Sequence, residues 1–320
     1  MRLSTRSIAP ALAFALAACS MSEPPPPANA ASAGAAAPAP LLTWDQFLGR
    51  TRPAPDHVIR YGEHERQVVD LYLPKGAGPH PVVVMIHGGC WSAPWDRTLM
   101  NHVSDDLRKR GIAVWNIDYR VIEKGGTGYP HVFDDTWAAI HALTIQGREH
   151  GLDPNRVVAA GHSAGGHLAL WYAARRARWN PPANVRMIPP PEFRSVVSLG
   201  GLPDLELAEQ PPGSGCGTEV IGQLVGRGQP GRSDPFADTS VPRMGALGIP
   251  QVLINGLNDR IIPNSFPEDY ARKMQAKGDD VRVRMIPNTG HIELIAPETR
   301  AWAAAVEEIQ RALGTRATRR

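Results

Sequence analysis

The chain has 320 residues, of which 42% are hydrophobic and 20% are charged, as expected for a globular protein with a sizeable core. The net charge is only +3 at pH 7, and Arg316, Arg319 and Arg320 supply much of that excess. A nucleic-acid partner is not expected, because no basic patch is interleaved with aromatic residues.

The first residues have the features of an export signal. Arg2 and Arg6 precede the apolar run IAPALAFALAAC, which is too short to cross a bilayer of about 30 Å as a helix. The stretch from Leu16 to Cys19 resembles a bacterial lipobox. We therefore predict a lipoprotein signal peptide over residues 1–18, with lipid attached to Cys19. The alternative is an ordinary cleaved signal with an incidental cysteine.

Lipid attachment would place the protein in the bacterial cell envelope, facing the periplasm. The residue after the cysteine is serine rather than the aspartate that resembles an inner-membrane retention signal, which favours the outer membrane. Residues 19–40 are rich in proline and alanine and carry almost no charge, so they cannot bury enough apolar surface to fold. We expect a tether there, followed by a folded domain over residues 41–320.

Short β-branched apolar runs alternate with longer helical patterns along this domain. Most of the runs are hydrophobic nearly throughout, as in strands buried on both faces of a sheet. The predicted strands are residues 57–62, 67–74, 81–87, 113–119, 157–162, 195–200, 250–256 and 281–287. Helices are predicted near 95–110, 131–149, 164–177, 264–277 and 297–313, the last with Pro297 at its start. This alternation predicts an α/β fold, with a mostly parallel sheet of about eight strands and helices on both faces.

The stretch 203–248 interrupts this rhythm. It is rich in glycine and proline and holds only one short helical pattern, EVIGQLVG. Because long insertions of this kind often cover a binding site, we expect a small cap-like insertion here.

A serine stands between small residues where a buried strand gives way to a helix, in GHSAG at residues 161–165. Gly161 and Gly165 leave out the Cβ atoms that would clash in a tight, strained turn. Such a turn lifts the hydroxyl of Ser163 clear of the sheet. The pattern predicts a nucleophile at Ser163, and the alternative is a small-residue turn without chemistry.

A serine hydroxyl is a weak nucleophile unless a base takes its proton, and the base needs an acid to orient it. Asp259 follows one predicted strand and His291 follows the last, and open α/β sheets place their sites at the carboxyl ends of strands. We therefore predict a catalytic triad of Ser163, His291 and Asp259. Asp279 and Asp280 are rival acids, but they precede a strand, at the opposite edge of the sheet.

Acyl transfer also needs hydrogen-bond donors for the oxyanion of its tetrahedral intermediate. The motif HGGCW, residues 87–91, follows a buried strand, and its glycines let the backbone approach a substrate. The predicted oxyanion-hole donors are the N–H groups of Gly89, Cys90 and Ala164. The predicted supports of this loop are His87, through hydrogen bonding, and Gly88, with Trp91 in the core or the pocket wall.

Five motifs, in this order, resemble those of the α/β-hydrolase superfamily: HGGCW, NIDYR, AGHSAGGHLAL, INGLNDRIIP and NTGHIEL. The nearest branch is similar to the kynurenine formamidase-like and feruloyl-esterase-like esterases, and the likeness covers residues 57–312. The resemblance implies an α/β-hydrolase fold, supports the triad and gives Asp118 a structural role. Cys90 departs from the family pattern, which often has an aromatic residue there.

Cys90 and Cys216 are the cysteines that remain after Cys19. In an oxidising periplasm they could form a disulfide between the oxyanion loop and the insertion. The alternative is two unpaired buried thiols, and the sequence leaves both open.

Together these features predict a serine hydrolase that cleaves carboxylic esters of short acyl or aryl groups, without a metal or a cofactor. The alternatives are an arylformamidase acting on an amide such as N-formylkynurenine, a small peptidase, and a non-catalytic binding protein on a hydrolase fold. The expected partners are a small-molecule ester and, through Cys19, the membrane. The sequence does not indicate an oligomeric state.

Overall fold

The computed structural model describes residues 40–181 and 187–315, which belong to one compact unit. The predicted signal peptide, the lipidation site at Cys19 and nearly all of the predicted tether lie outside the described residues. Within the two described ranges, no helix is both long enough and apolar enough to cross a membrane.

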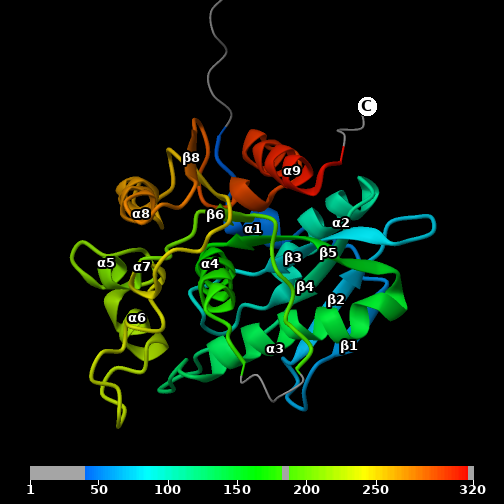
Figure 1. Ribbon diagram of the computed structural model, residues 1–320. Helices are drawn as coiled ribbons and strands as arrows, with labels where there is room; N and C mark the ends of the chain where they lie inside the picture. The colour runs from blue at the N-terminus through cyan, green and yellow to red at the C-terminus, as the bar shows by residue number, and fades with distance from the viewer. Residues whose placement is uncertain (1–39, 182–186, 316–320) are drawn as a thin grey trace, which may run out of the picture. The chain divides into compact units, whose positions relative to one another are not determined.

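An eight-stranded sheet forms the centre of the unit, in the order β1-β2-β4-β3-β5-β6-β7-β8. β2 pairs antiparallel with both β1 and β4, and all other neighbours are parallel. The strands are β1 (His57–Arg60), β2 (Val68–Tyr72), β3 (His80–Ile86), β4 (Ala113–Ile117), β5 (Leu152–His162), β6 (Val196–Leu199), β7 (Gln251–Gly256) and β8 (Val281–Ile286). Every predicted strand is present, and the predicted mostly parallel α/β sheet is confirmed (Figure 1).

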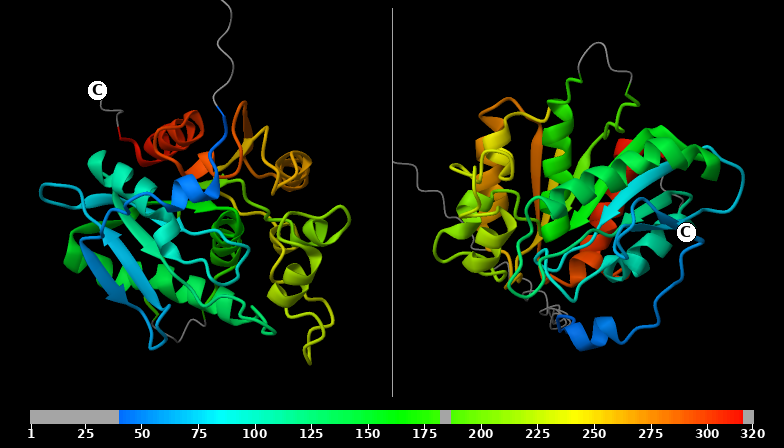
Figure 2. Two further views of the ribbon diagram at one scale, coloured as in Figure 1. Left: turned by 180° about the vertical axis from the view of Figure 1, so that it is seen from behind. Right: turned by 90° about the horizontal axis from the view of Figure 1, so that it is seen from below.

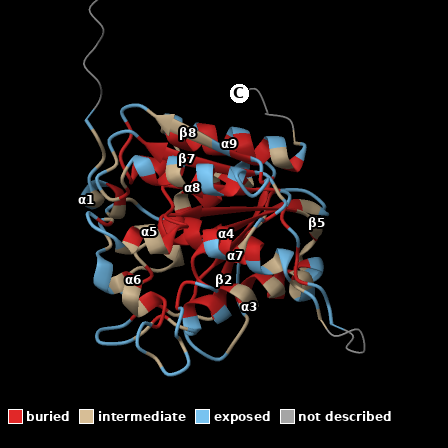
Figure 3. Ribbon diagram, turned by 60° about the vertical axis from the view of Figure 1, so that its left-hand side comes forward, coloured by how far each residue is buried: buried red, intermediate tan, exposed pale blue. Residues whose placement is uncertain are grey.

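Helices cover both faces of the sheet because its strands are apolar on both. Along β3, Val82 and Val84 join one core cluster, whereas Val83 and Met85 join the other, as the alternation of side chains along a strand requires. The first cluster includes side chains of α3 (His131–Gln146), α4 (Ala164–Ala177) and α8 (Ser265–Gln275). The second includes side chains of α1 (Trp44–Leu48), α2 (Asn101–Lys109) and α9 (Arg300–Leu313). Figure 3 shows the central strands as buried, with helices that are buried on one side and exposed on the other.

All five predicted helices form, with some of their ends shifted. The 3-10 helix η1 (Arg97–Met100) precedes α2, and the 3-10 helix η2 (Gly147–His150) follows α3. The last helix, α9, begins after Pro297 rather than at it. The Thr299 hydroxyl accepts a hydrogen bond from the Trp302 N–H at 3.1 Å and caps the helix there.

The insertion between β6 and β7 forms three short helices, α5 (Leu205–Glu209), α6 (Thr218–Leu224) and α7 (Val241–Met244). They gather on one side of the unit, beside α4 and away from β1 and β2 (Figures 1 and 2). Leu205, Ile221 and Val241 are fully buried and belong to the same core cluster as α4. The insertion is therefore packed onto the core of the sheet.

Candidate active site

The predicted site residues lie at one edge of the sheet, where the parallel strands end. Ser163 directly follows β5, the HGGCW loop follows β3, Asp259 comes after β7, and His291 comes after β8. Because these strands run parallel within one sheet, the loops at their carboxyl ends meet at the same edge. A small pocket of about 140 Å³ lies there, and both Ser163 and His291 line it.

Ser163 occupies a strained turn between β5 and α4. Its φ and ψ are 54° and −118°, a backbone conformation that residues with a side chain rarely adopt. A Cβ on Gly161 would lie 2.1 Å from the carbonyl oxygen of Gly165, and one on Gly165 would lie 2.2 Å from the carbonyl oxygen of Ile86. A Cβ on Gly88 would lie 3.0 Å from that of Ser163. Small residues therefore make room for the serine's turn, as predicted.

His291 and Asp259 form a buried hydrogen-bonded pair. Nδ1 of His291 lies 2.7 Å from Oδ2 of Asp259, whose side chain is fully buried. The other carboxylate oxygen accepts the N–H groups of Ile261 and Ile262 at 2.7 and 3.0 Å. Since the carboxylate can only accept, the proton of the neutral imidazole is on Nδ1, and Nε2 is left as the base.

Two neighbours contact the imidazole of His291. The ring of His162 packs against it with the centroids 4.4 Å apart, and Nε2 of His162 donates to the carbonyl oxygen of His291 at 3.1 Å. A Cβ on Gly200 would lie 3.2 Å from Nδ1 of His291, so the backbone of Gly200 also packs closely against the ring. Burial and the neighbouring His291 hold the pKa of His162 well below its usual value, which keeps His162 neutral.

Ser163 and His291 line the same pocket, although no hydrogen bond joins their side chains in the part of the chain that the structure describes. Catalytic hydrogen bonds are often long in the absence of substrate and tighten when it binds. Ser163 and His291 thus line one pocket, and Asp259 is bonded to His291.

The loop after β3 has the backbone conformation that oxyanion donors need. The φ angles of Gly89 and Cys90 are 103° and 52°, and both residues line the pocket. A Cβ on Gly89 would lie 2.3 Å from the Trp95 side chain, so only glycine fits there. Among the hydrogen bonds of the described residues, none uses the N–H of Gly89, Cys90 or Ala164, and these three groups can donate to a substrate.

Buried polar contacts support this loop. Nε2 of His87 lies 3.1 Å from Oδ1 of Asp118, and the His87 ring stacks on Tyr119 with the centroids 4.2 Å apart. The hydroxyl of Tyr119 donates to the carbonyl oxygen of His87 at 3.0 Å. Burial alone would raise the pKa of Asp118, but the hydrogen bond from His87 and the guanidinium of Arg66 together hold that pKa below its usual value. These contacts fit the supporting roles predicted for His87 and Asp118.

A disulfide joins Cys90 in the oxyanion loop to Cys216 in the insertion, with their Cα atoms 5.4 Å apart. Of the two alternatives that the sequence left open, the structure has the paired cysteines. Gly215, next to Cys216, donates its N–H to the carbonyl oxygen of Ile261 at 2.7 Å, and both residues line the pocket. The insertion therefore reaches the pocket and is attached to the oxyanion loop and to the loop that carries Asp259.

Sequence reasoning does not find three apolar residues that line the pocket, namely Trp44, Trp95 and Leu99. Trp44 belongs to α1, a five-residue helix that is too short to give an apolar periodicity. The one available signal is the capping box formed by Thr43 and Gln46. Trp91, in contrast, is fully buried in the core and is not among the pocket residues.

The rival acids do not reach this pocket. Both carboxylate oxygens of Asp279 accept backbone N–H groups, from Leu247 at 2.9 Å and from Gly248 at 2.9 Å. Asp279 therefore holds a turn before β7, while Asp280 is exposed. These positions agree with the prediction that Asp259, rather than Asp279 or Asp280, is the acid of the triad.

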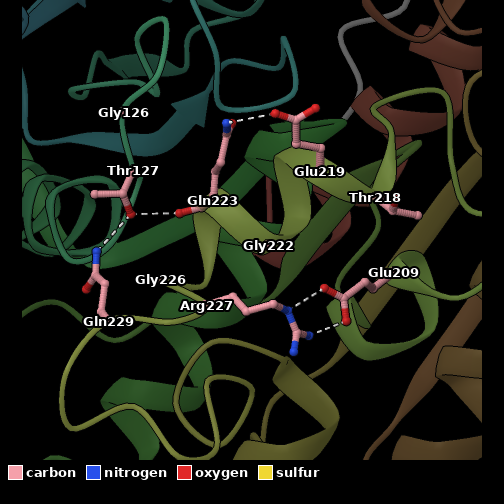
Figure 4. Close-up of a pocket in the computed structure, with 10 residues that line it drawn as sticks. All are labelled: Gly126, Thr127, Glu209, Thr218, Glu219, Gly222, Gln223, Gly226, Arg227 and Gln229. Carbon is pink, nitrogen blue, oxygen red and sulfur yellow. Dashed lines mark hydrogen bonds and ion pairs between the residues drawn. The ribbon is translucent and has the colours of Figure 1, made fainter.

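A wider hollow of about 630 Å³ lies against α6 and the loop around Thr127 (Figure 4). No predicted catalytic residue lines it. Its polar side chains pair with one another, namely Arg227 with Glu209, Gln223 with Glu219, and Gln229 with Thr127. Within residues 40–181 and 187–315, no cluster of histidine, cysteine, aspartate or glutamate side chains could hold a metal ion.

The sheet and the strained serine turn form an α/β-hydrolase fold, which solved esterases share. The sequence profile of the BD-FAE family matches residues 69–274, and the chain belongs to that family. The kynurenine formamidase-like branch stays a prediction.

Solved structures share the fold of this chain. A truncated carbohydrate esterase from gut microbiota has a TM-score of 0.67 at 17% identity, covering 83% of this chain and 98% of that one. Esterase B from Lactobacillus Rhamnosis (HN001) has a TM-score of 0.66 at 19% identity, covering 82% and 87%. Similarity at this level of identity shows a common fold.

Curated relatives match parts of the chain. The probable isoprenylcysteine alpha-carbonyl methylesterase ICME of Oryza sativa subsp. japonica is 26% identical over 245 residues, which are 74% of this chain and 58% of that protein. Carboxylesterase NlhH of Mycobacterium tuberculosis is 33% identical over 124 residues, 37% of each chain. The chain therefore spans less than two thirds of the length of these relatives.

Proposed function

We propose that the protein is a serine hydrolase that cleaves carboxylic esters of short acyl or aryl groups. One observation carries the proposal: the His291 imidazole, bonded through Nδ1 to Asp259 at 2.7 Å, shares a small pocket with Ser163. The printed names of the relatives and of the structural neighbours, which include a methylesterase, a carboxylesterase and an esterase, support an ester as the substrate.

In the first half of the reaction, Oγ of Ser163 attacks the ester carbonyl carbon while Nε2 of His291 takes the hydroxyl proton. The carboxylate of Asp259 orients the imidazole and stabilises the imidazolium that forms. The oxyanion accepts hydrogen bonds from the free N–H groups of the oxyanion loop and of Ala164. Collapse of the intermediate breaks the ester bond, and His291 gives its proton to the leaving alcohol.

In the second half, water attacks the acyl-enzyme. Nε2 of His291 takes a proton from the water, and the same donors hold the new oxyanion. Collapse then releases the carboxylic acid and returns the proton to Oγ of Ser163. The net reaction consumes one ester and one water and gives one acid and one alcohol.

The pocket beside Ser163 has room for a small group. Its volume is about 140 Å³, and an apolar cavity of roughly 150 Å³ holds one benzene molecule. Trp44, Trp95, Leu99 and Ile261 supply apolar walls. A short acyl chain or a single aryl ring fits this space.

Replacement of the nucleophile tests the proposal. Ser163→Ala is expected to lower kcat/KM for p-nitrophenyl acetate by about 10³-fold or more, because removing one triad member removes the attack itself. Ser195→Ala is the matched control. Ser195 is also buried, but it lies just before β6, away from the pocket, and donates to the carbonyl oxygen of Pro250. A wild-type rate in Ser163→Ala would refute the mechanism.

Two further measurements separate the alternatives. A fluorophosphonate probe should label the wild-type protein at Ser163, and a folded protein that resists the probe would favour a non-catalytic binding protein. Parallel rates on N-formylkynurenine and on a short peptide would identify an arylformamidase or a peptidase, if either exceeded the rates on esters.

We propose further that Cys19 carries lipid and holds the protein in the bacterial cell envelope, facing the periplasm, with the outer membrane favoured. The support is the order of three features: Arg2 and Arg6, then a short apolar stretch, then Leu16-Ala17-Ala18-Cys19. Cells that express the wild-type chain should incorporate radioactive palmitate into it, and Cys19→Ser should abolish that label. Absence of label in the wild-type protein would contradict this proposal.

A further inference from the structure

One wall of the active-site pocket comes from a segment outside the family match. Trp44 on α1 lines the pocket together with Ser163 and His291, whereas the match to the BD-FAE family begins at residue 69. The Trp44 ring lies 5.1 Å from that of Trp95, measured between centroids. Trp95 in turn lies against Gly89 of the oxyanion loop. The two indoles thus extend one apolar wall outward from the oxyanion loop.

Several contacts fix the position of α1. Thr43 and Gln46 form a capping box at its start. Phe47 is buried, and its ring lies 5.6 Å from that of His102, edge to face. After the helix, Arg50 pairs with Glu298 at 2.6 Å. Trp44 therefore stands on a short but anchored helix, as a specificity-determining side chain requires.

A buried carboxylate connects this segment to the loop of the catalytic histidine. Glu293, at the start of the 3-10 helix η3 (Glu293–Ile295), accepts the N–H of Leu42 through one oxygen and the N–H of Gly290 at 2.9 Å through the other. Glu293 is almost fully buried. The position of Trp44 is thus set relative to His291 by shared hydrogen bonds.

We propose that Trp44 determines the length of the acyl group that the enzyme accepts. The inference rests on the proposed ester hydrolysis at Ser163. The acyl group is the part of the substrate that stays bonded to Oγ of Ser163 in the acyl-enzyme, so we assign the small pocket beside that atom to it. Its volume, about 140 Å³, is close to that of an apolar cavity that holds one benzene molecule. Among the apolar walls, Leu99 is buried in the core, Trp95 lies against Gly89, and Ile261 packs against Gly215. The indole of Trp44 is only partly buried, so its removal opens the pocket with the least disturbance of the other walls.

The test uses the full chain and two ester series. One series varies the acyl group from acetate to octanoate with p-nitrophenol as the constant leaving group. The other keeps acetate constant and varies the alcohol among phenol, 4-nitrophenol and 1-naphthol. In Trp44→Ala, the ratio of kcat/KM for octanoate to that for acetate should rise about fourfold for each methylene newly buried, or about tenfold or more in total. The alcohol series should keep its wild-type order.

Three controls make the result decisive. Trp44→Phe should shift the acyl preference in the same direction by a smaller amount, and it serves as the test if Trp44→Ala does not fold. Trp137→Ala should leave both series unchanged. Trp137 is also half-buried, but it packs against Tyr172 outside the pocket, with the ring centroids 5.1 Å apart. Fluorophosphonate labelling and thermal unfolding check that each variant is folded and reactive.

Each outcome bears on one proposal in a defined way. Hydrolysis that depends on Ser163, with the same acyl preference in Trp44→Ala and Trp44→Phe as in the wild type, overturns the role of Trp44 and leaves the proposed function standing. A change confined to the alcohol series also overturns it, since the pocket would then hold the leaving group. If no ester hydrolysis depends on Ser163, the proposed function fails and the role of Trp44 falls with it.

Discussion

Breaking the disulfide between Cys90 and Cys216 should weaken the fold and the oxyanion hole together. The bond closes a loop of 126 residues. In the chain-entropy treatment, such a loop restricts the unfolded chain by about 5 kcal/mol at 25 °C, and measured effects are typically 2–4 kcal/mol. A domain of ordinary stability has only about 5–15 kcal/mol to lose. Cys216→Ser should therefore lower the urea midpoint strongly.

The same change should affect catalysis, because Cys90 is a predicted oxyanion donor. Complete loss of one such donor costs about 10²–10³ in rate. Cys216→Ser keeps the Cys90 N–H and only frees its loop, so we expect a fall in kcat of up to about 10²-fold. The substrate for this assay is p-nitrophenyl acetate, measured well below the temperature at which the variant unfolds.

Reduction of the wild-type protein provides the matched comparison. Urea unfolding with linear extrapolation should give the reduced wild type and Cys216→Ser the same midpoint, and reductant should not change the midpoint of the variant. Two titratable thiols in denatured, unreduced wild-type protein would refute the bridge itself. Equal midpoints for oxidised and reduced wild type would refute the energetic argument.

Three further outcomes are expected. Asp259→Asn should reduce kcat by about 10⁴-fold with little change in KM, because the amide stabilises the wrong tautomer of His291. Steady-state kinetics measure this effect, and a reduction of only tenfold would contradict the orienting role of Asp259. Gly89→Ala should cost about 1–3 kcal/mol of stability and slow fluorophosphonate labelling, since its Cβ would meet Trp95 at 2.3 Å; wild-type labelling and stability would contradict the close contact. Burial lowers the pKa of His167 to about 4, so its contribution to stability is complete above pH 6.5 and is lost as the pH falls toward 4. Between pH 7 and 5 the loss from this residue is about 2 kcal/mol. In His167→Gln, which can still donate to Thr239, the free energy of unfolding should fall less between pH 7 and pH 5 than in the wild type. Urea titrations at several pH values measure this, and the same dependence on pH in both proteins would contradict the role of His167.

The parts of the site that follow strands were predictable, because local pattern determines them. Ser163, Asp259 and His291 each come after a recognisable apolar run, and parallel strands bring their carboxyl ends to one edge. The glycines around Ser163 were also predictable, since only a residue without Cβ tolerates contacts of 2.1–2.2 Å with neighbouring carbonyl oxygens.

The parts of the site that depend on distant contacts were not predictable in the same way. Trp44 belongs to a helix without measurable periodicity, and its neighbour Trp95 lies far along the chain. Glu293 acts through the N–H of Leu42, 251 residues away. The pairing of Cys90 with Cys216 stayed open because spacing along a chain does not give distance in space. The start of α9 was misplaced at Pro297 because the cap at Thr299 competes with it.

The hydrogen bonds of Glu293 join the start of the folded domain to the loop of His291, which matters when shorter forms of this protein are prepared. The stretch that matches the family, residues 69–274, leaves out both His291 and Trp44. A fragment that begins at the first strand would still lack Trp44. The smallest preparation suited to kinetics should begin ahead of Leu42 and run through α9. Measurements of substrate preference on anything shorter would report a different cavity.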